Sequence, residues 1–183
     1  MTADGRGLTP PVLVAGVGNI FFGDDGFGVE VARRLAVVDL PDWVTIADYG
    51  ISGMHLAYDL ANGYGSANGY GSAILIDATP RGGVPGTVYV IEPEPVPEPA
   101  PLASGGPLAG GALFDAHGMQ PDVVLGVLGM LGAPAGRMLI VGCEPAAADP
   151  GIGLSAPVAA AVDGAVAAVL RLIGVGTSEQ AAP

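Results

Sequence analysis

The sequence contains very few positive charges. Of its 183 residues, 6 are lysine or arginine and 18 are aspartate or glutamate, which gives a formal net charge of −12. Nucleic acids and anionic membranes attract clusters of basic side chains, so we expect neither as a partner. The sequence also lacks a G-x-x-x-x-G-K-[ST] motif, which argues against a phosphate-binding loop.

The usual nucleophiles of hydrolases are also missing. The single cysteine, Cys143, excludes an internal disulfide. It lies in an apolar run that we predict to be a central strand, so we interpret it as a packing residue. No G-x-S-x-G motif is present to expose a serine on a sharp turn. Neither of these two kinds of covalent catalysis is indicated.

Long, uninterrupted apolar segments are absent as well. The N-terminus, MTADGRGLTPP, has no apolar signal-peptide core. The most hydrophobic region, residues 154–175, contains Asp163, Gly164 and Arg171, and its valines recur at helical spacing. This pattern describes one buried helix face rather than a membrane span. We therefore expect a cytoplasmic protein.

What the sequence does contain is typical of a globular protein rich in loops. Half of its residues are hydrophobic, with 31 glycines and 17 prolines. The length fits a single domain, which we place at 12–175, between a flexible lead at 1–11 and a tail at 176–183. Within it, the hexapeptide ANGYGS occurs twice in tandem at 61–72, which we interpret as a duplicated surface loop. Residues 93–116 form a Pro- and Gly-rich loop.

Short apolar runs alternate with helical patterns along the chain. We predict strands at 12–17, 43–47, 73–76 and 138–143, a one-sided strand at 87–92, and helices at 27–38, 53–61, from about 120, and after a capping Ser155. This alternation predicts an α/β protein, a three-layer α/β/α sandwich around a mostly parallel sheet.

The turn after the first strand, GVGNIFFGDDG, superficially resembles a dinucleotide-binding loop. However, Phe21 occupies the position where that fingerprint requires its third glycine. Asp24 and Asp25 would also repel a pyrophosphate at the N-terminus of the following helix. We therefore interpret this loop as one that presents carboxylates.

Five polar side chains are expected at the carboxyl ends of the strands, where open α/β sheets bind ligands. Four of them come at or after the end of a predicted strand, namely Asp25, Asp48, Asp77 and Glu144, and His117 precedes the third helix. Two carboxylates and one imidazole can hold a borderline divalent metal and leave coordination positions open. A metal site at this edge is therefore one hypothesis.

Each candidate also has a purely structural explanation. Either aspartate of the first loop could cap the following helix. Asp77 could close a turn through its own backbone, and His117 could be a loop histidine bonded to the main chain. The other histidine, His55, is expected on an exposed helix face beside Asp59.

Taken together, several motifs resemble the [NiFe]-hydrogenase maturation endopeptidases. They are VAGVGNIFFGDDGFGVEVARRL, DYGISGM, AILIDA, DAHGMQPDVVL, and VGCEPA followed by GIGLS, which together span residues 12 to 173. The resemblance implies a three-layer fold with a five-stranded twisted sheet in which one strand is antiparallel. Residues 87–92 are the natural candidate for that strand.

The resemblance also implies residues for the site. By motif, the catalytic and metal-contacting triad of the family falls on Asp25, Asp77 and His117. Some members of the family carry Glu at the first position, so Asp25 is one methylene shorter than those. The implied activity is removal of a C-terminal extension from a [NiFe]-hydrogenase large-subunit precursor after nickel insertion. The nickel would be carried by the substrate, and no tightly bound metal is expected in the resting protein.

Two other functions stay open at this point. The same side chains could serve a non-catalytic assembly factor that senses metal in a metalloenzyme. A nucleotide-binding α/β protein is the weaker option, given the loop sequence described above.

Overall fold

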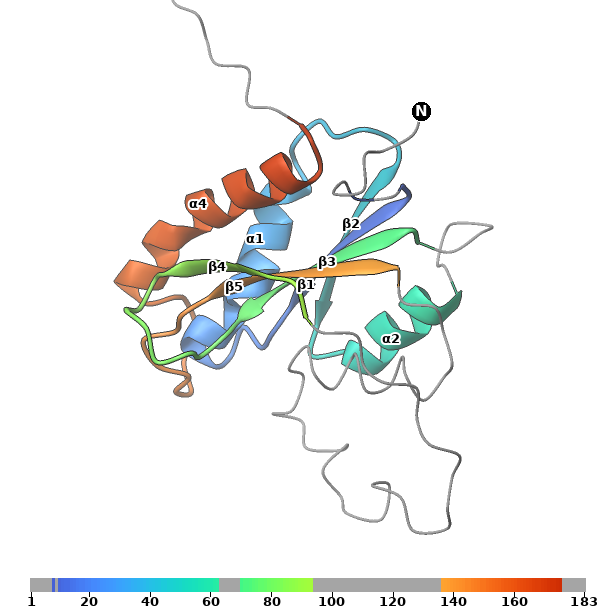
Figure 1. The fold of residues 1–183 in the computed structure, drawn as a ribbon. Coiled ribbons are helices and arrows are strands. Elements are labelled where there is room, and N and C mark those ends of the chain that lie inside the picture. Colours follow the sequence, from blue (N-terminus) through green and yellow to red (C-terminus); the bar gives the residue numbers. More distant parts are fainter. Residues whose placement is uncertain (1–7, 9, 63–69, 94–135, 176–183) are drawn as a thin grey trace, which may run out of the picture.

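A five-stranded sheet forms the centre of the molecule. The computed structural model describes residues 8, 10–62, 70–93 and 136–175. The strands are β1 (Val12–Val17), β2 (Val44–Gly50), β3 (Ser72–Ala78), β4 (Val88–Ile91) and β5 (Arg137–Cys143). Their order is β2-β1-β3-β5-β4 (Figure 1). All neighbours pair in parallel except β4, which runs antiparallel to β5. The predicted mixed, mostly parallel sheet is confirmed.

The inner strands are apolar throughout because helices cover both faces of the sheet. Every residue of β1 is buried, and β3 and β5 are each buried except for one terminal residue. The outer strands β2 and β4 are only partly buried. The strand predicted at 87–92 is confirmed in β4, but its predicted alternation is wrong, because Val88, Tyr89 and Ile91 are all partly buried and Val90 is exposed.

Helices pack on both faces of the sheet, as Figure 1 shows. On one face, α1 (Phe27–Leu35) and α4 (Ala156–Leu172) bury one apolar cluster against alternate residues of β1, β3 and β5. On the other face, α2 (Gly53–Asn62) buries Leu56 and Ala57 against the remaining alternate residues. The predicted three-layer α/β/α arrangement is confirmed.

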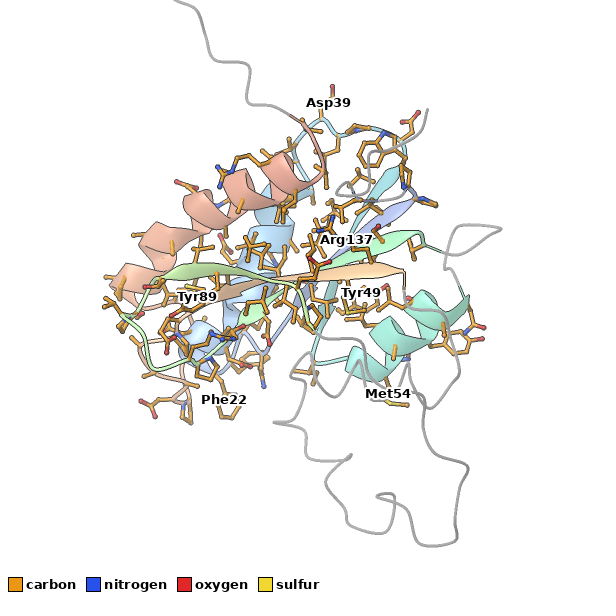
Figure 2. The ribbon with its side chains drawn as sticks, viewed as in Figure 1. Phe22, Asp39, Tyr49, Met54, Tyr89 and Arg137 are labelled. Carbon is orange, nitrogen blue, oxygen red and sulfur yellow. The ribbon has the colours of Figure 1, made fainter. Side chains whose placement is uncertain are left out.

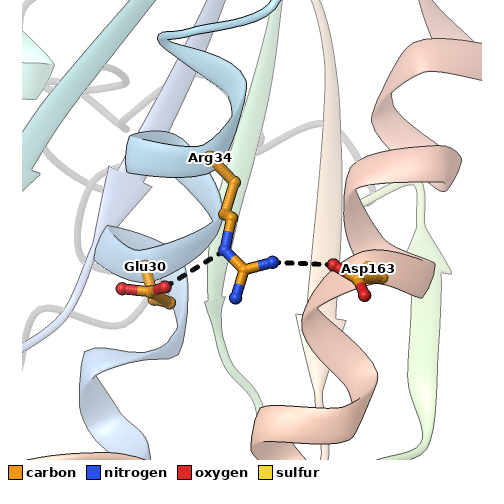
Figure 3. Close-up of polar contacts among 3 residues, drawn as sticks. All are labelled: Glu30, Arg34 and Asp163. Atoms are coloured by element: carbon orange, nitrogen blue, oxygen red, sulfur yellow. Dashed lines mark hydrogen bonds and ion pairs between the residues drawn. The ribbon is translucent and has the colours of Figure 1, made fainter.

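The packed pair of helices is also linked on its outer side. Arg34 of α1 lies between two carboxylates, at 3.3 Å from Glu30 Oε1 and 2.9 Å from Asp163 Oδ1 of α4 (Figure 3). These groups are exposed, so water screens the ion pairs and they stabilise the fold little. The apolar contact beneath them holds the two helices together.

Glycine 28 sets how closely α1 approaches the sheet. A Cβ atom at Gly28 would collide with the carbonyl oxygens of Val17 and Ile76. The first turn of α1 therefore lies directly against the carboxyl ends of β1 and β3. This contact places η1 (Gly23–Gly26), the 3₁₀ turn that precedes α1, beside the end of β3.

Several predicted boundaries differ from the structure by a few residues. Helix α1 ends at Leu35 rather than at residue 38, because Ala36 and Val37 are exposed and Val38 closes a tighter turn on the Leu35 carbonyl. Strand β2 continues to Gly50 because its pairing with β1 extends to Val17. Strand β3 is also longer than predicted and contains Asp77.

Some predictions concern parts of the chain that the structure does not describe. They are the helix from about 120, nearly all of the 93–116 loop, and the tail at 176–183. The ANGYGS repeat is described at its two ends, where residues 61 and 62 complete α2 and Ser72 begins β3.

The last helix, α4, has the single buried face that the valine spacing predicts. Val158, Val162, Val169 and Ile173 are buried, whereas Asp163 and Gly164 on the other side are exposed. Within the described ranges, no helix combines the length and the apolar character that a membrane crossing requires.

Candidate functional site

Two carboxylates, Asp25 and Asp77, lie at the edge formed by the carboxyl ends of β1 and β3, and the charge of Asp25 acts on Asp77. Asp77 is 4% exposed and occupies the end of β3, opposite Gly142 of β5. Burial raises the pKa of Asp77 well above its ordinary value, and the negative charge of Asp25 raises it further. A hydrogen bond from the Ala78 amide opposes this rise. The paired carboxylates therefore form a site where a positive charge would be stabilised.

The position of Asp25 is fixed by the loop that carries it. The Asn19 amide donates a hydrogen bond to Asp25 Oδ2 over 2.7 Å. Gly18 has a φ of +126°, and a Cβ atom there would collide with the Asp25 carbonyl oxygen. The loop thus folds tightly back on Asp25, whose side chain stays half-buried. Helix α1 has no side-chain cap, so the capping explanation for this pair of aspartates is wrong.

The neighbouring Asp24 has a different environment. Its side chain is 1% exposed and accepts hydrogen bonds from the amides of Ala146, Ala147 and Ser155 and from the Ser155 hydroxyl. Burial raises the pKa of Asp24, but these hydrogen bonds outweigh burial and leave the pKa below its ordinary value. Asp24 therefore joins the first loop to the segment between β5 and α4.

Ser155 begins α4 as predicted, but it does not cap the helix with its side chain. Its hydroxyl donates to Asp24 Oδ2 over 2.9 Å instead. The predicted N-cap position of Ser155 is confirmed, but its side chain makes no capping hydrogen bond, because the buried Asp24 carboxylate accepts the hydroxyl.

Glu144 lies at the same edge but is already occupied. Its carboxylate accepts hydrogen bonds from the amides of Arg81 and Gly82 and from the Tyr89 hydroxyl. Burial raises the pKa of Glu144, and these donors, with the Gly83 amide, lower it overall. Glu144 therefore holds the turn that follows β3 and is not free to bind a ligand.

Asp48, at the end of β2, has weaker contacts. It accepts a hydrogen bond from the Gly50 amide over 3.0 Å and lies 3.8 Å from Arg33. Both side chains of this ion pair are substantially exposed. Asp48 therefore borders the site without being buried in it.

His117, the third predicted ligand, lies outside the described residues, and its place in the site stays a prediction. The described ranges contain no cluster of three or more possible metal ligands. His55 is exposed, as predicted. The expected pair with Asp59 is absent from the ion pairs among the described residues, and the Asp59 carboxylate accepts the Tyr49 hydroxyl instead.

Cys143 is fully buried in the core, as its apolar surroundings predict. Burial is the main reason that its pKa rises to about 11, and the charges of Asp24 and Glu144 contribute to the rise. A thiol with this pKa carries almost no thiolate at neutral pH, so Cys143 is not a nucleophile.

Sequence reasoning did not find the cavity that is lined by Asn19, the hydrogen-bond partner of Asp25. It measures about 240 Å³ and lies between the loop after β1 and the end of β2. Bulky residues at Ile20 and Phe21, in a segment that otherwise reads as a polar loop, were the available signal.

Comparison with known proteins gives consistent matches over most of the chain. The family model described as hydrogenase maturation protease (HycI) matches residues 29–172. The hydrogenase 2 maturation protease of Escherichia coli is 32% identical over 168 residues, which cover 88% of this chain and 90% of that protein.

Solved structures agree with the sequence matches. A hydrogenase 2 maturation peptidase from a Thaumarchaeota archaeon superposes with a TM-score of 0.64 at 32% identity, covering 90% of this chain and 99% of that one. An endopeptidase from Escherichia coli, solved in solution, gives a TM-score of 0.68 at 31% identity, covering 88% and 91%.

Proposed function

Because the chain belongs to the hydrogenase maturation protease family, we propose that it removes the C-terminal extension of a [NiFe]-hydrogenase large-subunit precursor. The cleavage follows insertion of nickel into the precursor, and the nickel travels with the substrate. The proposed partner is therefore the precursor itself, and the cytoplasm stays the expected compartment.

In this proposal Asp25, Asp77 and His117 contact the nickel that the precursor holds. The observation that carries it is the placement of Asp25 beside the buried Asp77, which raises the pKa of Asp77. Two carboxylates that repel each other are stabilised when a cation lies between them. The arrangement thus favours a substrate that brings a divalent metal over one that lacks it.

Hydrolysis then uses the substrate's own metal together with a carboxylate. The nickel polarises the peptide carbonyl or the attacking water. A carboxylate of the pair accepts the proton from water. This division of roles needs neither a serine nor a cysteine nucleophile.

The test compares nickel-loaded with nickel-free precursor, and mass spectrometry follows the loss of the C-terminal peptide. We expect cleavage of the loaded precursor alone. Asp25→Asn and His117→Ala should each abolish cleavage while the protein remains folded. Asp163→Asn, which changes an exposed carboxylate of α4, serves as the control and should cleave normally.

The possible outcomes separate the alternatives. If the nickel-free precursor is cut equally well, the metal-sensing role is refuted. If either triad variant cleaves at the wild-type rate, that residue has been assigned wrongly. A loaded precursor that binds but keeps its full mass would favour the non-catalytic assembly factor.

A further inference from the structure

The cavity beside the first loop has mainly apolar walls. Side chains of the loop, of α1 and of the segment after β2 form these walls, namely Ile20, Phe21, Val29 and Ile51. Its volume of about 240 Å³ is below the roughly 300–1,000 Å³ that is typical of pockets for small-molecule ligands. The cavity is therefore better matched to a single side chain than to a cofactor.

This cavity is continuous with the loop that holds Asp25. Asn19 lines the cavity, and its amide donates the 2.7 Å hydrogen bond to Asp25 Oδ2. One residue of an extended peptide advances about 3.3–3.6 Å. A substrate with its scissile bond beside Asp25 therefore brings a nearby side chain to the opening of the cavity.

The charged groups at the cavity already neutralise each other. Arg33 and Asp48 both line it, and their side chains form an ion pair at 3.8 Å. Among the residues that line the cavity, a charged side chain would meet no unbalanced charge of opposite sign, and it would lose its water. An apolar side chain loses no favourable hydration when it enters the cavity.

The apolar walls also extend outward to the surface. Phe21 is 61% exposed and Ile51 is 54% exposed, although both are large apolar side chains. Met54 is also exposed, and it lies at the same end of the molecule as Phe22 in Figure 2. Exposed apolar groups that rim a cavity are typical of surfaces that a partner covers.

We propose that this cavity receives an apolar side chain of the precursor, located within a residue or two of the bond that is cut. The inference rests on the proposed function, because it takes the substrate to be a peptide segment held at Asp25. Ile51 and Phe21 are then specificity-determining residues, and Asn19 fixes the distance between the cavity and the carboxylates.

The test measures which precursors are preferred, rather than overall activity alone. Nickel-loaded precursors carry Ala, Leu, Phe or Asp in turn at each of the positions next to the cleavage site. The wild-type protein should discriminate at one of these positions, with kcat/KM about tenfold or more higher for Leu than for Asp. Ile51→Ala enlarges the cavity and should shift the preference at that same position toward Phe.

The matched control is Val37→Ala, which shortens a valine that is 86% exposed at the end of α1. It should leave the order of preference unchanged. Thermal unfolding of both variants checks the fold, since both wild-type side chains are exposed. If Ile51→Ala and the wild type rank all precursors identically, the cavity does not select the substrate and the inference is overturned.

The failure of the proposed function looks different. In that case the wild type cuts none of the nickel-loaded precursors, and the inference about the cavity is lost with the activity on which it rests. If the wild type cuts all of them but shows no preference for an apolar residue at any position, the protease assignment stands and the inference alone is refuted.

Discussion

Adjacent aspartates of the first loop should respond in opposite ways to the same substitution. We predict that Asp24→Asn destabilises the fold strongly, whereas Asp25→Asn leaves stability nearly unchanged and removes activity. Both substitutions replace one carboxylate oxygen by an NH2 group, and the side chain keeps almost the same shape. Any difference between them therefore reports the surroundings of each side chain and not its size.

The magnitude for Asp24 follows from its hydrogen bonds. Oδ2 accepts from the Ala146 amide at 2.8 Å, the Ala147 amide at 3.2 Å and the Ser155 hydroxyl at 2.9 Å, and Oδ1 accepts from the Ser155 amide at 2.6 Å. An asparagine can keep its oxygen on one side only, so at least one buried amide faces another donor. An unsatisfied buried donor costs about 1–3 kcal/mol, and the retained bonds lose their charge-assisted strength. We expect a loss of roughly 2–4 kcal/mol.

The Asp25 side chain has fewer hydrogen bonds to lose than the Asp24 side chain. Its side chain accepts the Asn19 amide, a bond that the asparagine oxygen can retain. Removal of the negative charge also relieves the repulsion from Asp77. The free energy of unfolding of Asp25→Asn should therefore lie within about 1 kcal/mol of the wild type.

The assay is urea-induced unfolding followed by circular dichroism, with cleavage of nickel-loaded precursor measured on the same samples. Asp163→Asn is the matched control, because its carboxylate lies on the surface of α4 and makes one exposed ion pair. The control should change the unfolding midpoint very little. If Asp24→Asn unfolds at the wild-type midpoint, the buried hydrogen bonds of Asp24 do not stabilise the fold by the amount estimated above. If Asp25→Asn is as unstable as Asp24→Asn, the division of roles is wrong.

The remaining predictions concern pH, backbone packing and the thiol. Folding lowers the pKa of Asp24, so the stabilising effect of its carboxylate is complete above the ordinary pKa of 3.8 and is lost as the pH falls below that value. In acid titrations, the difference in unfolding free energy between wild type and Asp24→Asn should therefore shrink below this pH. Gly28→Ala should destabilise by about 3 kcal/mol or more, because its Cβ meets two carbonyl oxygens. Gly164→Ala, on the open side of α4, should stabilise by about 0.5–1 kcal/mol, and urea unfolding compares the two. Cys143, with a pKa of about 11, should resist a thiol reagent in the folded protein, and Cys143→Ala should retain cleavage.

The sheet could be predicted because its signals are local. The runs that became β1, β3 and β5 are apolar over their whole length, as strands covered on both faces must be. The antiparallel direction of β4 came from the family resemblance, since an alternating pattern in the sequence gives no strand direction. The end of α1 was misplaced because an apolar residue at 38 continues the helical spacing although the chain has already turned away.

The separate roles of the carboxylates could not be predicted, because their partners are distant in the sequence. Asp24 bonds to residues 122 to 131 positions further along the chain, and Glu144 reaches back 63 positions to the Arg81 amide. Apart from the family motif that assigned the site to Asp25, nothing in the local sequence distinguishes Asp24 from Asp25. The fold alone decides which of the two accepts hydrogen bonds from distant amides and which acts electrostatically on Asp77.

The number of donors at each carboxylate gives the physical basis for locating the site. Asp24 and Glu144 are surrounded by amide and hydroxyl donors, and these lower their pKa values despite burial. Asp77 is equally buried, but among the described residues the Ala78 amide is the one donor that opposes the effect of burial, and the pKa of Asp77 rises instead. A buried carboxylate with few donors and a second carboxylate beside it is stabilised by a positive charge that the protein itself does not provide. The described arginines near this edge are committed elsewhere, Arg33 to Asp48 and Arg81 to the face of Tyr89. In the proposed function this charge comes with the substrate, as a protease that waits for a metal-loaded precursor would require.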